Sequence, residues 1–360
     1  MKGLVFFMAM FGVLGLRAQS IELFGFERQV QAAAFLPGDS LVVAYGVDFM
    51  DVDGKRQLGR KLIFWNAQSG ALIREVELNQ LRKIDHNGKE LRGLLGLARI
   101  SPDQSKLYLL GTQYQGSGTQ IASVIHVYDL LNDSIKSFVI DSINRVTSFS
   151  INPSNQDELV CIYADESFRT CVGRHNLNID SNMRRLKAYQ HPWIPLACSF
   201  SSNNKHLFIG TGGGLRRGTL EVFDCASNKL MRTINLRENV TRILSTNERL
   251  YAVGESQTFV YRLDNFSNQG VNRNLIEQIL THSKSALLAP KHVEEMTKIR
   301  IQTLNNSGML EWTSRFPMVQ ASFWESANCI ISIVEKDEFN QTEYNKRAPS
   351  LILVPLADFN

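Results

Sequence analysis

Three stretches of the sequence align without gaps and decide the fold: LIFWNAQSG (62–70), IHVYDLLND (125–133) and LEVFDCASN (220–228). In each, an apolar run ends in an aromatic residue, Trp65, Tyr128 or Phe223, and an Asn or Asp follows directly. A polar turn comes next, and then a second apolar run. Turn-forming residues between two alternating apolar runs mark a hairpin. Each stretch therefore predicts two consecutive antiparallel strands, here the third and fourth of a repeated unit.

Other segments predict the first two strands of these units. Each of them has an apolar run, a polar turn and a second apolar run that ends in small residues. They are AAFLPGDSLVVAYG (33–46), ARISPDQSKLYLLG (98–111), SFSINPSNQDELVCIYA (148–164), CSFSSNNKHLFIGTG (198–212) and TRILSTNERLYAVGE (241–255). Four short antiparallel strands that recur along the chain at intervals of roughly 40 to 60 residues are typical of the blade of a β-propeller.

We count seven blades between residues 21 and 360, which makes the predicted fold an all-β, seven-bladed propeller with a single domain. The sixth blade (283–314) has the weakest pattern and is placed partly by elimination. The predicted first strands begin near Val30, Leu94, Val146, Leu196, Val240, Ser283 and Met318.

The last blade has strand patterns only at 318–326, 329–335 and 350–356, so its fourth strand is missing. A spare strand pattern, IELFGF (21–26), precedes the first blade. We expect this strand to occupy the outer edge of the last blade and to close the ring. Such a closure hides strand edges that would otherwise pair with other chains.

The repeat resembles the degenerate WD40 family of propellers over nearly the whole chain after residue 20. The aromatic–Asp pairs are similar to the Trp-Asp pair of that family, and Ser101-Pro102-Asp103 is similar to its usual first turn. The Gly-His that usually opens a WD40 repeat is missing, so the family's hydrogen-bonded His–Ser/Thr–Trp–Asp network is not expected here. A propeller is a rigid disc with loops on two faces, which favours a non-enzymatic scaffold for protein partners.

The N-terminus has the pattern of a secretory signal peptide, predicted over residues 1–20. Lys2 precedes an apolar run (Leu4 to Leu16), and Arg17-Ala18-Gln19-Ser20 supplies small exit residues. This run is shorter than the approximately 20 residues that a helix needs to span a bilayer; a buried N-terminal helix is the alternative. The segment resembles signal peptides of Bacteroidota. We therefore expect an exported chain, soluble in the periplasm or at the cell surface, without membrane insertion.

Charge and motifs exclude several classes of function. The formal net charge is +4, to which Lys2 and Arg17 contribute, and no Lys/Arg run forms a nucleic-acid patch. The glycines at 210–214 lack the Lys-Ser/Thr of a phosphate loop. The acidic residues at 48–53 lack the Glu of a calcium loop, since Arg60 stands at its position. We expect no metal, no cofactor and no catalysis. The alternative is a propeller enzyme with a cofactor, metal or sugar site in the central channel.

Long predicted loops mark one sector of one face as the candidate partner-binding surface. They span 46–60, 79–92, 112–120 and 335–349, in blades that become neighbours once the ring closes. Insertions on one face of a repeat array often carry binding, although surface loops also tolerate insertion without function. Aromatic and cationic residues are the types enriched at interface cores. The candidates are Phe49, Lys55, Arg56, Arg82, Lys83, Tyr114, Tyr344, Lys346 and Arg347. The expected partner is a protein, in a narrower version an outer-membrane protein of a transport or secretion complex.

Two of the five cysteines form a candidate disulfide. Cys161 and Cys171 lie five residues on either side of Glu166, which a symmetric hairpin would place directly opposite each other. The pair can oxidise in an exported protein, and two reduced, buried thiols are the alternative. Cys198, Cys225 and Cys329 are expected to be core thiols.

Overall fold

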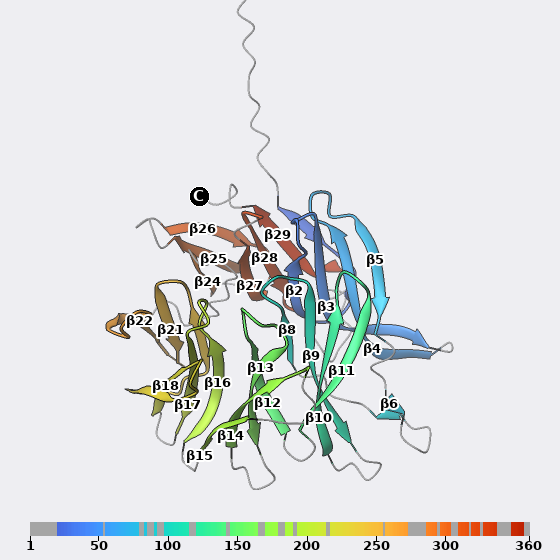
Figure 1. Cartoon of the computed structure of the whole chain (residues 1–360). Coiled ribbons are helices and arrows are strands. Elements are labelled where there is room, and N and C mark those ends of the chain that lie inside the picture. Colours follow the sequence, from blue (N-terminus) through green and yellow to red (C-terminus); the bar gives the residue numbers. More distant parts are fainter. Residues whose placement is uncertain are drawn as a thin grey trace, which may run out of the picture.

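The computed structural model of the chain is all-β, with strands β1 to β29 arranged as sheets around a centre (Figure 1). It describes residues 20–52, 55–78, 83–84, 90–91, 97–114, 120–141, 145–164, 170–178, 184–189, 193–213, 217–254, 256–272, 286–293, 296–303, 309–316, 318–324, 327–336 and 347–355. The candidate signal peptide, 1–20, lies outside this part of the chain except for Ser20. Among the described residues, no helix is long and apolar enough to cross a membrane.

Five four-stranded antiparallel sheets follow one another along the chain. Sheet 1 contains β2 (Val30–Phe35), β3 (Leu41–Val52), β4 (Lys55–Asn66) and β5 (Leu72–Glu77). Sheet 2 contains β8 (Leu97–Ile100), β9 (Lys106–Tyr114), β10 (Gln120–Asp129) and β11 (Ser134–Asp141). Sheet 3 contains β12 (Arg145–Ile151), β13 (Glu158–Ala164), β14 (Thr170–Asn176) and β15 (Arg184–Tyr189). Sheet 4 contains β16 (Ile194–Phe200), β17 (His206–Gly212), β18 (Gly218–Asp224) and β19 (Leu230–Leu236). Sheet 5 contains β20 (Arg242–Ser245), β21 (Arg249–Val253), β22 (Thr258–Arg262) and β23 (Asn268–Asn272).

The remaining strands form three further sheets. Sheet 6 contains β24 (Ala286–Val293), β25 (Met296–Thr303) and β26 (Met309–Ser314). Sheet 7 contains β27 (Met318–Trp324), β28 (Cys329–Val334), β29 (Leu351–Pro355) and β1 (Ile21–Leu23). A two-stranded sheet of β6 (Lys83–Ile84) and β7 (Glu90–Leu91) lies between sheets 1 and 2 in sequence. The first strand of each of sheets 1 to 7 begins within three residues of its predicted position.

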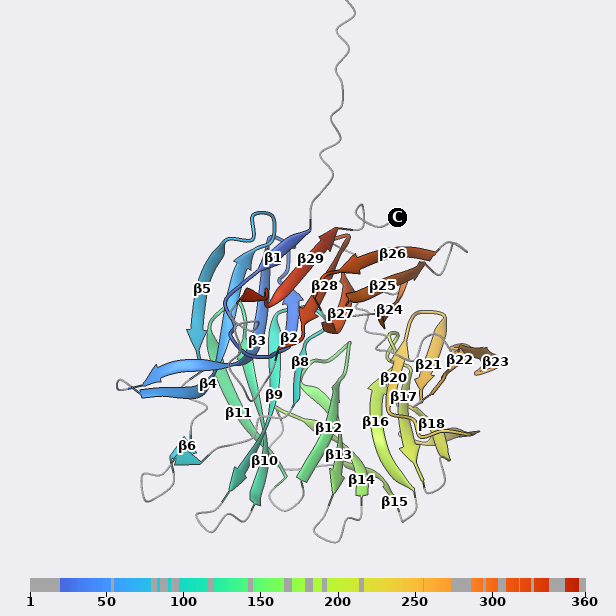
Figure 2. The same ribbon diagram turned by 180° about the vertical axis from the view of Figure 1, so that it is seen from behind.

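The two ends of the described chain meet in sheet 7. Its strand order is β1-β29-β28-β27, and Ile21 and Leu23 of β1 pair with Leu353 and Leu351 of β29. Figures 1 and 2 show the two strands side by side from opposite directions. The predicted strand 21–26 ends early, at Leu23. Gly25, whose φ is +144°, lies in the segment that leads from β1 to sheet 1, in a conformation that residues with a side chain rarely adopt.

The core lies between neighbouring sheets. Phe35 of sheet 1 packs edge-on against Trp324 of sheet 7, with ring centroids 6.0 Å apart. Phe208 of sheet 4 contacts Phe266, which follows β22 of sheet 5, in the same way at 6.2 Å. Aromatic pairs of this geometry stabilise beyond the area that they bury. Strands such as β13, β17 and β18 are buried along nearly their whole length, which agrees with their almost continuously apolar sequences.

The Asn or Asp that follows the aromatic residue closes the turn between the third and fourth strands. Asn66 Oδ1 accepts hydrogen bonds from the backbone N–H groups of Gln68 and Ser69 at 3.0 and 2.8 Å. Asp129 and Asp224 accept equivalent backbone bonds in sheets 2 and 4. Short polar side chains favour turns because they bond to their own backbone in this way. The repeated aromatic–Asp pair is therefore a strand end followed by a turn cap.

The candidate disulfide is not formed, and all five cysteines are thiols. In the β13–β14 pairing, Cys161 lies opposite Gly173, and Cys171 lies opposite Tyr163. The register is centred one residue later than the symmetric hairpin that we expected, which moves each cysteine two positions away from its predicted partner. Both side chains are buried in one apolar cluster with Tyr108. They behave as core residues.

Candidate functional site

The largest deviation from a regular sheet is the long hairpin of β3 and β4. Its strands pair without interruption from Leu41 with Asn66 to Val52 with Lys55, which leaves only residues 53–54 to connect them. The prediction of a loop over 46–60 was therefore wrong, because the hairpin of the first unit simply continues. β-Branched and aromatic residues such as Val47, Phe49 and Val52 favour this extension. Figure 2 shows the hairpin projecting beyond the other strands of sheet 1.

The structure brings three of the predicted partner-binding residues, Phe49, Lys55 and Arg56, onto this hairpin. Lys83 lies in β6, and Tyr114 is the last residue of β9. Arg347 is exposed just before β29. The other three, Arg82, Tyr344 and Lys346, lie outside the described residues.

Phe49 is half-buried, because a cation covers one face of its ring. The guanidinium carbon of Arg28 lies 4.3 Å from the ring centroid, and the Arg28 side chain is itself buried. Such a contact contributes about 0.5–2 kcal/mol, depending on how far the cation is desolvated. Through this contact, Phe49 connects the hairpin to the segment between β1 and β2. Only part of the Phe49 side chain is then accessible to a partner.

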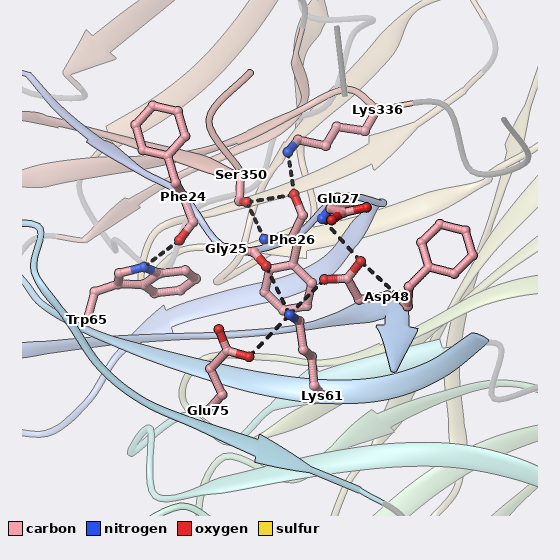
Figure 3. A network of polar contacts seen from close by, with 11 residues as sticks. Phe24, Gly25, Phe26, Glu27, Asp48, Lys61, Trp65, Glu75, Lys336 and Ser350 are labelled. Carbon is pink, nitrogen blue, oxygen red and sulfur yellow. Dashed lines mark hydrogen bonds and ion pairs between the residues drawn. The ribbon is translucent and has the colours of Figure 1, made fainter. Parts of the chain in front are cut away.

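A buried ion pair supports the hairpin from below (Figure 3). Lys61 Nζ lies 2.7 Å from Asp48 Oδ2, and it donates a hydrogen bond of 2.9 Å to the Gly25 carbonyl oxygen. Asp48 Oδ1 accepts bonds from the backbone N–H groups of Glu27 and Phe49 at 3.1 and 2.9 Å. The two charges therefore connect both strands of the hairpin to the segment that leads from β1 to β2.

The C-terminal part of the chain contacts the same segment from the other side. Lys336, which follows β28, is buried, and its Nζ donates to the Phe26 carbonyl oxygen. Ser350 Oγ accepts from the Phe26 backbone N–H at 2.9 Å. Trp65 Nε1 donates to the Phe24 carbonyl oxygen at 2.9 Å. Residues 24–27 therefore bind to sheet 1 and to the C-terminal part of the chain together, as Figure 3 shows.

Burial lowers the pKa of Lys336 to about 8, although the carboxylates of Asp48 and Glu27 oppose this shift. The unfolded chain then binds more protons than the folded chain between pH 8 and the ordinary lysine range, so stability should rise with pH there. We expect the free energy of unfolding of the unmodified chain to increase between pH 7 and pH 9.5 relative to that of Lys336→Met. Urea denaturation at both pH values measures this difference. Equal pH dependence in the two proteins would contradict it.

The polar residues of this cluster were not predicted as a unit. Asp48 was considered only as part of a calcium loop, which its ion pair with Lys61 argues against. Among the described residues, no group of three or more His, Cys, Asp or Glu side chains is placed to hold a metal ion. Lys61 in the apolar stretch KLIFW was the one sequence feature that could have indicated a buried polar cluster, because a lysine that is buried in a strand requires a partner for its charge.

Comparison with known proteins gives the fold. No family model matches the chain, and no curated protein matches it. Among solved structures, the Dos1 propeller is similar with a TM-score of 0.54 and 10% identity, over 87% of this chain and 91% of that one. Sqt1 of Chaetomium thermophilum, bound to the N-terminus of ribosomal protein L10, has a TM-score of 0.54 and 12% identity over 93% and 98%. A chain of the mitotic checkpoint complex has a TM-score of 0.53 and 13% identity over 86% and 90%. At these identities the likeness shows the fold alone, which is that of a β-propeller.

Proposed function

We propose that this chain is a non-enzymatic, seven-bladed scaffold that binds a protein partner through the β3–β4 hairpin and the loops beside it. Sheets 1 to 7 would be the blades, and β1 would close the ring on sheet 7. The pairing of β1 with β29 supports this closure. The observation that carries the function is the hairpin itself, whose long projecting strands are fixed at their base by buried charges. A rigid, projecting element loses little entropy when it binds.

The narrower form of the proposal concerns location and partner. The pattern of residues 1–20 supports export, to the periplasm or the cell surface. The partner would be a protein of the cell envelope, and an outer-membrane protein of a transport or secretion complex fits this location. The structure of Sqt1 with a segment of ribosomal protein L10 is an example of a propeller of similar fold that holds a protein ligand.

Shortening the hairpin should remove the partner without unfolding the chain. We replace residues 50–57 by Asn-Gly, which keeps the pairing of Phe49 with Leu58 and the Asp48–Lys61 ion pair. The partner that co-purifies with the unmodified chain from native membranes should then be lost, while the melting temperature changes little. Quantitative mass spectrometry of affinity-purified complexes measures the loss.

The matched control removes two exposed cations elsewhere, Lys136 and Lys229, by substitution with Ala. This variant should keep the partner, because it loses as many cations as the shortened hairpin, which lacks Lys55 and Arg56, but keeps the hairpin intact. The shortened hairpin also lacks Asp51 and Asp53, so its own net charge does not change. Retention of the partner by the shortened hairpin would contradict the proposed docking site. A bound metal or cofactor in the purified chain, with no protein partner, would instead support the enzyme alternative.

A further inference from the structure

Beyond its base, the β3–β4 hairpin is a ribbon of two strands. The pairing of β2 with β3 ends at Gly46, and the pairing of β4 with β5 ends at Lys61. From there β3 and β4 continue to pair with each other as far as Val52 and Lys55. Figure 1 shows the hairpin continuing past the end of β5. Among the described strands, no other strand pairs with this ribbon, so β3 and β4 each have an outer edge along it.

The outer edge of β3 is already engaged by nearby residues of the chain itself. The Val47 backbone N–H donates to the Gln29 carbonyl oxygen at 3.3 Å. Two residues further along the strand, the Phe49 backbone N–H donates to Asp48 Oδ1 at 2.9 Å. The guanidinium of Arg28 also covers the Phe49 ring on this side. A further strand would need these two N–H groups, so we do not expect a strand to add to β3.

The outer edge of β4 is identified by one hydrogen bond at its base. The Leu78 backbone N–H donates to the Arg60 carbonyl oxygen at 2.9 Å, so the backbone polar groups of Arg60 point away from β3. In an antiparallel sheet, every second residue of a strand turns its N–H and C=O groups toward the same neighbour. The backbone N–H and C=O groups of Leu58 and Arg56 therefore also point outward, and those of the residues between them point toward β3.

This edge of β4 has the form of a template for strand addition. The register between β3 and β4 contains no bulge, and residues 55–60 contain no proline. Proteins usually interrupt or cover a long regular edge, because its outward backbone groups pair with other chains. In strand addition, an extended segment joins such an edge, and its main-chain hydrogen bonds provide affinity.

The sequence of β4 favours a negatively charged strand beside it. Residues 55–60 include Lys55, Arg56 and Arg60 but no Asp or Glu. Opposite charges on paired strands stabilise the pairing, and like charges placed opposite each other destabilise it. Pairing of β4 with the β4 strand of another copy would bring cations next to cations. An acidic strand, in contrast, would be stabilised by the same residues.

We propose that the partner of the hairpin contributes an extended, acidic segment that adds to sheet 1 as a strand along the outer edge of β4. Its main chain would bond to the outward N–H and C=O groups of Arg56 and Leu58, and its Asp or Glu residues would lie beside the cations of β4. This inference rests on the proposed function, because it specifies how a partner binds the hairpin.

Amide hydrogen exchange of the purified full chain, resolved to single residues by electron-transfer fragmentation, tests this edge directly. The N–H groups of Gln57 and Gly59, which point toward β3, should exchange at least about tenfold more slowly than those of Arg56 and Leu58. A synthetic peptide of alternating threonine and glutamate should then slow exchange at Arg56 and Leu58, whereas a peptide of alternating threonine and lysine should not. Four equal rates in the free chain, or equal effects of the two peptides, would overturn the proposal.

A proline variant tests the same edge against the partner from native membranes. Leu58→Pro removes one outward N–H, and proline is tolerated at an edge position of this kind. Leu58→Val is the matched control, because it changes the side chain but keeps the N–H. Leu58→Pro should reduce the co-purified partner by about tenfold or more, and Leu58→Val should retain it. Both variants should melt close to the temperature of the unmodified chain.

The outcomes separate this inference from the proposed function. If Leu58→Pro keeps the partner but the hairpin shortened at residues 50–57 loses it, strand addition is wrong and the docking site stands. If both keep the partner, the docking site is wrong as well. Sedimentation of the purified chain identifies the remaining occupant: a dimer that Leu58→Pro dissociates would show that a second copy pairs with β4, and it would overturn the proposal.

Discussion

Removal of residues 20–27 is expected to lower the melting temperature of the chain by roughly 10 °C or more. The deletion takes away β1 and with it the outer edge of sheet 7. It also removes Leu23 and Phe26, which are fully buried, and a buried side chain of this size contributes about 2–5 kcal/mol. Lys61 and Lys336 would lose the backbone carbonyls that they bind, at about 1–3 kcal/mol for each unsatisfied group. A change of 1 kcal/mol moves the melting temperature of a large domain by about 2 °C.

Differential scanning calorimetry measures this effect, and Phe24→Ser is the matched control. Phe24 lies in the same segment, but its side chain is 48% exposed, and its backbone carbonyl still accepts from Trp65 in the variant. The control should therefore melt close to the unmodified chain. Unchanged melting after deletion of residues 20–27 would contradict the closure of the ring by β1.

The repeated hairpins could be predicted because their signals are local. Each hairpin is determined by interactions within a few residues of its turn, so it can be read from a short stretch of sequence. Examples are the turn formers at 36–40 and 101–105 and the aromatic–Asp pairs. The strand patterns at 318–326, 329–335 and 350–356 likewise agree with β27, β28 and β29. The last unit lacks one strand and the N-terminus has a spare one, so the pairing of the two could be predicted from the strand patterns alone.

The parts that could not be predicted depend on register and on distant partners. A shift of one residue in the β13–β14 turn separates Cys161 from Cys171. The loop predicted over 46–60 is in fact a continuation of the two strands of the hairpin. Asp48 and Lys61 in these strands can be buried only because they form an ion pair with each other. Nothing within either strand indicates that its partner lies 13 positions away in sequence, diagonally across the neighbouring strand of the hairpin.

Asp48→Ala is expected to destabilise the chain by about 3–5 kcal/mol, since it leaves the Lys61 charge buried. The side chains of Lys61 and Asp48 are only 10% and 3% exposed, and their charged atoms lie 2.7 Å apart. The substitution also removes the acceptor of two backbone N–H groups, those of Glu27 and Phe49. Glu75, 3.3 Å from Lys61, offsets part of the loss, but its side chain is 42% exposed and screened by water.

A double-mutant cycle with Lys61→Met isolates the ion pair, measured as free energies of unfolding in urea. The double variant should be less destabilised than the sum of the single variants, because it contains no unpaired buried charge. The pair of Arg262 and Asp264 provides the control: it has the same 2.7 Å separation, but its side chains are 55% and 57% exposed. Asp264→Ala should cost less than about 1 kcal/mol, since exposed ion pairs contribute little. If Asp48→Ala costs no more than this control, the buried pair does not support the hairpin, and a partner would meet a flexible element at that position.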